Sequence, residues 1–139
     1  MSKAALDSEV REEATKFVLP LTGREVDQIC FDYGITLVVE GTDTIRLESP
    51  FTVHLGGLTS VVDPERLETA AVLLALFRAV VLRAEAGKDG ALILEFDHER
   101  WLRAEAIDDG EAWEIGGGLP PVTPSYRIAC APGGGVVLD

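Results

Sequence analysis

Short segments in which apolar and polar residues alternate fill most of this chain, and turns rich in glycine and aspartate separate them. Residues 36–40 and 44–48 alternate in this way on either side of Gly41-Thr42-Asp43, which predicts a β-hairpin. The same pattern predicts further strands at residues 26–31, 51–55, 80–85, 92–96, 101–104, 112–115, 126–130 and 136–138. Because the connections are short, neighbouring strands are expected to pair as an antiparallel meander.

One segment carries a helical signal instead. Asp63-Pro64-Glu65 suits a helix start, because aspartate caps free N–H groups, proline fits the first turn and glutamate complements the helix dipole. Apolar side chains follow at helical spacing, at Leu67, Ala70, Ala71, Leu74 and Phe77. We therefore expect one main helix at about residues 63–77 that packs on a sheet. Strands, one helix and more strands predict an α+β fold, a mostly antiparallel, meander-rich sheet packed against this helix.

A length of 139 residues fits one domain with a sizeable core. Residues 1–18 have a weak helical stripe, and a weakly helical segment and a disordered one are both open there. Residues 19–139 are expected to form a single α+β domain. The longest apolar run, residues 70–77, is too short to span a bilayer, and the N-terminus has no apolar leader, so we expect a cytoplasmic protein.

The charge balance restricts the class of partner. The chain has 24 acidic residues against 12 lysines and arginines, a net charge of −12. Phosphate backbones and anionic lipids are repelled by such a protein, so neither nucleic acid nor membrane is expected as a partner. Solubility is the plain explanation of this charge, and a basic protein partner is the sharper one.

Residues 95–114 concentrate this charge and hold both tryptophans, Trp101 and Trp113. Eight acidic residues and two arginines give this stretch a net charge of −6. Glu111, Trp113 and Glu114 are the candidate partner-binding residues, because an exposed aromatic ring among carboxylates would anchor a basic protein. Core tryptophans and a solvated sheet edge are the structural alternative. On the binding hypothesis, Glu111→Lys with Glu114→Lys abolishes partner binding and leaves folding intact.

Catalytic chemistry finds no support in the residue pattern. His54 and His98 are isolated, and Ser49 and Ser60 lie in no nucleophile motif. The sequence therefore predicts no catalytic residues, no cofactor and no metal. Cys30 and Cys130 are expected to be reduced, buried thiols.

Five short motifs carry a resemblance that spans about residues 19–138. They are residues 19–24, 45–51, 89–96, 111–115 and 132–134. Together they resemble a family of small actinobacterial domains of unknown function, and residues 111–114 and 132–134 are similar to immunity partners of bacterial polymorphic toxins. The family's turn after residue 96 is commonly Asp-Gly, whereas Asp97-His98-Glu99 stands here. The resemblance implies no catalytic residues.

Three functions follow as hypotheses. The first is a non-enzymatic interaction protein, an immunity-like binder of a basic partner. The second is a homo-oligomeric module, a homodimer at the simplest, in which Val80-Val81 and Val136-Val137 supply sheet edges that pair between copies. The third is a small-molecule-binding domain with a ligand between helix and sheet.

Overall fold

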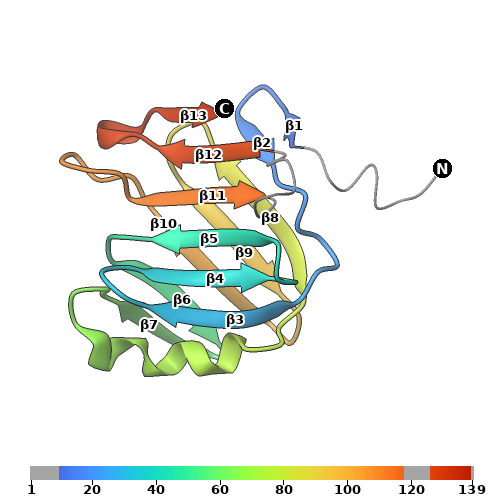
Figure 1. Cartoon of the computed structure of the whole chain (residues 1–139), viewed down its shortest axis with the longest axis vertical. Coiled ribbons are helices and arrows are strands. Elements are labelled where there is room, and N and C mark those ends of the chain that lie inside the picture. Colours follow the sequence, from blue (N-terminus) through green and yellow to red (C-terminus); the bar gives the residue numbers. More distant parts are fainter. Residues whose placement is uncertain (1–9, 118–125, 139) are drawn as a thin grey trace.

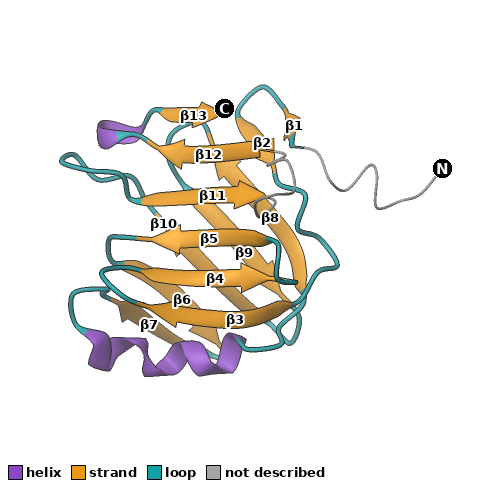
Figure 2. Cartoon of the chain, in the orientation of Figure 1, coloured by secondary structure: helices purple, strands orange, loops and turns teal. Residues whose placement is uncertain are grey.

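The computed structural model, which describes residues 10–117 and 126–138, consists of two antiparallel sheets packed face to face (Figures 1 and 2). The seven-stranded sheet contains, in spatial order, β1 (Arg11–Glu12), β2 (Lys16–Val18), β8 (Val81–Gly87), β9 (Leu92–Phe96), β10 (Arg100–Ala104), β6 (Phe51–Leu55) and β7 (Leu58–Val62). The six-stranded sheet contains β13 (Val136–Leu138), β12 (Tyr126–Cys130), β11 (Trp113–Gly117), β5 (Asp43–Leu47), β4 (Ile35–Val39) and β3 (Val26–Phe31).

This β-sandwich corrects the predicted α+β fold. Each sheet buries its apolar face against the other, so no helical layer is needed to cover either one. Alternate residues of facing strands point inward and are fully buried, among them Leu37, Ile45, Leu94 and Leu102. The chain moves from the six-stranded sheet to the other at β6 and returns at β11, so both sheets combine distant parts of the sequence.

The main helix predicted at residues 63–77 is also wrong. Its place is taken by η1 (Leu67–Leu76), a 3-10 helix that contacts the edge strands β7 and β3 at one end of the sandwich (Figure 2). A 3-10 helix has three residues per turn, and the buried positions have that spacing: Ala70, Leu73 and Leu76. Leu74 and Phe77 of the expected stripe are at least half exposed.

The expected cap of this helix is likewise not formed by Asp63. Its side chain accepts a hydrogen bond from the backbone N–H of Glu65, two residues before the first residue of η1, and Arg66 occupies the cap position without a side-chain bond. Asp63 and Pro64 therefore belong to a turn that ends β7.

The N-terminal segment is extended where the structure describes it. Residues 1–9 lie outside the described residues, whereas β1 and β2 take up part of residues 10–18 in place of the expected helix or disorder. Phe17 of β2 is buried in the core, so this segment is an integral part of the sandwich. The division of the chain at residue 18 stays a prediction.

Most predicted strands are confirmed. The hairpin of β4 and β5 pairs Ile35 with Leu47 and Val39 with Asp43. In β8 a shift of register between Val81 and Arg83 leaves Leu82 exposed, whereas strict alternation would bury it. Strand β7 was not predicted. Val81 lies in an interior strand, so of the two proposed edges only Val136-Val137, in β13, lies at a sheet edge.

Two further expectations concern the cysteines and the membrane. Cys30 and Cys130 are both free, but only Cys130 is fully buried, and their strands β3 and β12 lie apart in the sheet with β4, β5 and β11 between them. Within the described ranges, no helix is long and apolar enough to cross a membrane.

Candidate functional site

Trp113, the predicted aromatic anchor, lies in the core. Its side chain is fully buried, and its indole Nε1 donates a hydrogen bond of 2.8 Å to the carbonyl oxygen of Gly90. Strand β11 places it on the inner face together with Ile115. The ring is therefore not available to a partner, and Trp113 is a core tryptophan, as the structural alternative expected.

The motif around Trp113 forms part of a tightly packed corner. Gly90 has φ +101°, and a Cβ there would lie 2.7 Å from Ala106 Cβ and 3.1 Å from Cys130 Sγ. The N–H of Gly133 donates to the carbonyl of Ile107 across the same corner. The turn before β9, the loop before β11 and the turn before β13 thus meet here. Three of the five motifs behind the sequence resemblance overlap these segments, and close packing explains Gly90, Trp113 and Gly134 within them.

Glu111 and Glu114 converge on one cation, Arg127 of β12. Arg127 donates to both carboxylate oxygens of Glu114 at 3.1 Å, and its guanidinium lies 3.7 Å from Glu111. Arg46 stands directly opposite Glu114 on β5. Glu114 is therefore held by Arg127 on the outer face of the six-stranded sheet, while the side chain of Arg46 pairs with Asp32 and Glu48 instead. Glu111 is the freer of the two carboxylates.

Trp101 is the partly exposed tryptophan. It lies on the outer face of the seven-stranded sheet and stacks on His54 of β6, with ring centroids 5.4 Å apart and planes within 5°. Both nitrogens of His54 are engaged, Nδ1 with the hydroxyl of Thr59 and Nε2 with the N–H of Gly57. This cluster fixes the β6–β7 hairpin. The alternation of β10 in the sequence could have placed Trp101 on the outer face. Leu102 and Ala104 face inward, so Trp101 and Arg103 must face outward.

The basic side chains of the described surface are all ion-paired, whereas some of the acidic ones are not. Every lysine and arginine among the described residues lies within ion-pair distance of a carboxylate. In the same part of the chain, five exposed acidic side chains have neither an ion pair nor a hydrogen bond: Asp27, Glu65, Glu99, Asp108 and Asp109. The described surface therefore offers unpaired negative charge and no unpaired lysine or arginine.

Two of these acids are adjacent in the β10–β11 loop, here called the acidic loop (residues 105–112), which projects at the left of Figure 1. Glu105 and Glu111 flank them and are exposed, although each has a basic partner. The base of the loop is fixed, since the N–H of Gly133 and the N–H of Glu48 bind its carbonyls at Ile107 and Ala112. The structure thus presents Asp108 and Asp109 on a fixed base.

One buried polar network joins β5 and β12 to the segment just before β3. Tyr126 donates its hydroxyl to Asp43 at 2.9 Å, and Arg24 reaches the other carboxylate oxygen at 3.1 Å. Burial, together with the neighbouring carboxylate, raises the pKa of Tyr126 far above its ordinary value. Each charge has its partner, so the network fixes β5, β12 and the segment before β3 to one another and offers nothing to a ligand.

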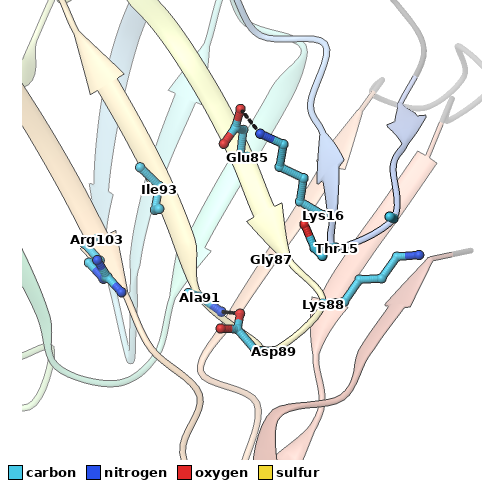
Figure 3. A pocket seen from close by; sticks show the side chains of 10 residues that line it. Thr15, Lys16, Glu85, Gly87, Lys88, Asp89, Ala91, Ile93 and Arg103 are labelled. Atoms are coloured by element: carbon cyan, nitrogen blue, oxygen red, sulfur yellow. Dashed lines mark hydrogen bonds and ion pairs between the residues drawn. The ribbon is translucent and has the colours of Figure 1, made fainter.

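A shallow depression of about 550 Å³ lies on the outer face of the seven-stranded sheet near β2 (Figure 3). Its three cations are already paired, Lys16 with Glu85, Lys88 with Glu12 and Arg103 with Glu105. A small-molecule site needs enclosure and converging free polar groups. This depression supplies neither, and the small-molecule hypothesis stays a prediction.

Catalytic groups do not converge among the described residues. No cluster of three or more His, Cys, Asp or Glu in that part of the chain is placed to hold a metal ion. The Ser49 hydroxyl is buried and makes no hydrogen bond, so no base activates it. The exposed His98 pairs only with Asp97, at 3.7 Å.

Comparison with known proteins gives one result. Residues 17–138 match a family model described as a family of unknown function, DUF6188. No curated protein and no solved structure matches the chain. The coarser part of the sequence resemblance, to domains of unknown function, is thereby confirmed, and the actinobacterial and immunity-like parts stay predictions. Since the match covers most of the chain, this protein belongs to the DUF6188 family of unknown function.

Proposed function

We propose that this protein is a non-enzymatic interaction protein that binds a basic protein partner. The observation that carries the proposal is the division of charge: the described lysines and arginines are all ion-paired, while five exposed carboxylates have no partner. A basic protein gains from unpaired carboxylates without having to break an internal ion pair.

The acidic loop is the proposed contact surface. Asp108 and Asp109 are unpaired, and Glu111 is exposed with only a long contact of 3.7 Å to Arg127. The fixed base of the loop reduces the ordering entropy that binding would cost. Glu111 thus keeps the role predicted for it, Glu114 contributes by holding Arg127, and Trp113 supports the loop from the core.

A sharper form of the proposal makes the partner a toxin and this protein its immunity partner. It rests on the sequence resemblance of residues 111–114 and 132–134. Expression of the adjacent gene with and without this chain tests it, and the expected result is that growth inhibition appears only without the chain. A neighbouring product that is harmless when expressed alone contradicts the immunity role but not basic-partner binding.

Binding itself is tested with the purified product of the adjacent gene and three forms of the full chain. Asp108→Asn with Asp109→Asn should weaken association at least about tenfold, and the loss should shrink at high salt. Asp27→Asn with Glu65→Gln removes the same charge elsewhere and should bind like wild type. Equal binding by both double variants, or a neighbouring product that is acidic, would overturn the proposal.

A further inference from the structure

Four strands end the two sheets, and β7, which η1 contacts within the same molecule, is the one that is neither very short nor irregular in register. β1 has two residues, both charged, and β13 has three. β3 carries an irregularity of register near Asp27, and its Val26 is already bonded to Arg78 and Ala79. β7 has five residues in unbroken register with β6, without charge, proline or bulge. An edge of this kind pairs with another strand unless something blocks it.

The backbone of β7 has two residues whose hydrogen-bonding groups face outward. The turn Gly56-Gly57 joins Leu55 and Leu58 as a two-residue hairpin, so Leu58, Ser60 and Val62 bond to β6. Thr59 and Val61 therefore direct their N–H and C=O groups away from the sheet. In the described chain no hydrogen bond from another element reaches these groups, whereas the next outward N–H, that of Asp63, is taken by Thr69.

We propose that β7 pairs antiparallel with β7 of a second copy, so that the seven-stranded sheets of two molecules join into one. A two-fold axis at Ser60 places Thr59 of one copy opposite Val61 of the other. These are the residues with free backbone groups, so the register makes four hydrogen bonds and pairs all four outward groups of each copy. Leu58 and Val61, which are 65% and 62% exposed, become covered by the second copy.

Charge selects a second copy as the occupant. Two molecules of net charge −12 repel each other, and association is favoured only through a surface that brings no carboxylates together. β7 has no charged residue, and its neighbour His54 has both nitrogens engaged in hydrogen bonds. A basic partner would gain nothing from this strand. The surface is distinct from the acidic loop, so this proposal stands or falls independently of the proposed function.

Sedimentation of the full chain over a range of concentrations tests the dimer. Wild type should show a monomer–dimer equilibrium, and Val61→Lys should raise the dissociation constant at least about tenfold. Val137→Lys is the matched control, because it makes the same charge change at an exposed valine of another edge strand. A wild type that stays monomeric throughout, or equal effects of both lysines, would overturn the proposal.

A cross-link tests the register. The two Ser60 residues face each other as a non-hydrogen-bonded pair, with Cα atoms about 4.5 Å apart, a distance that a disulfide spans. In a Cys30→Ser background, oxidation of Ser60→Cys should give a covalent dimer on non-reducing electrophoresis, and Val137→Cys should not. A yield no greater than that of Val137→Cys rules out this register and with it the proposed pairing.

Discussion

The indole Nε1 of Trp113 donates a 2.8 Å hydrogen bond to the carbonyl oxygen of Gly90, and this bond ties β11 to the turn between β8 and β9. The two residues belong to opposite sheets, so the bond closes one corner of the sandwich. Trp113, which the sequence suggested as a partner-binding residue, therefore holds the two sheets together.

Trp113→Phe should lower the free energy of unfolding by about 2–4 kcal/mol, because it leaves a buried carbonyl unpaired and opens a cavity. Urea denaturation followed by far-UV circular dichroism measures the loss. Trp101→Phe, on the outer face, should cost about 1 kcal/mol, mainly through its stack on His54. Equal losses would mean that the corner is not the more important of the two sites.

Gly90→Ala should be more costly than an ordinary glycine substitution. Its φ of +101° strains any side chain, and the added methyl group would also meet Ala106 and Cys130. We expect a loss of about 3 kcal/mol or more from strain and overpacking together. Gly23→Ala, at φ +84° with nothing within 4 Å of its Cβ, isolates the strain and should cost about 1–2 kcal/mol. Similar midpoints for the two variants would contradict the close packing described here.

Glu114→Lys should destabilise the fold, which makes it unsuitable as a probe of binding. The new cation would stand opposite Arg46 and beside Arg127, which would lose its two-pronged acceptor. The expected loss is about 1 kcal/mol or more, against less than about 0.5 kcal/mol for Glu111→Lys, whose contact is longer. Thermal unfolding compares them. If Glu114→Lys unfolds like wild type, the arginines around Glu114 do not constrain it.

The sequence predicted the hairpins because apolar and polar residues alternate in each strand and the turns contain glycine or aspartate. It could not separate helix types at residues 67–76, since apolar side chains occupy both the set Ala71, Leu74 and the set Ala70, Leu73, Leu76. Only the tertiary structure, which buries every third residue, decides between them. β7 was missed because Leu-Thr-Ser-Val-Val after two glycines alternates weakly.

The candidate site could be predicted only in part, because its geometry also depends on the tertiary structure. Acidic neighbours surround both tryptophans, so charge does not reveal which ring is buried. The face of each strand decides, and that depends on pairings between distant segments, such as Trp101 with His54. The pairing of Glu111 and Glu114 with Arg127 could not be predicted from nearby residues, because it depends on the register in which β11 and β12 pair in the sheet.

Stability at high pH should depend on Tyr126. Burial beside Asp43 raises its pKa in the folded state, so the folded protein retains a proton that the unfolded chain releases above about pH 10. The contribution is present in full below that pH, and above it stability should fall by about 1.4 kcal/mol per pH unit from this group.

Tyr126→Phe should be less stable at pH 7, because Asp43 loses a donor, but should lack this component of the decline. Tyr33→Phe, at a ring that is 98% exposed, is the control and should follow wild type. Urea midpoints measured from pH 7 to 11 give the comparison, and parallel curves for wild type and Tyr126→Phe would show that the buried hydroxyl does not govern the alkaline limit.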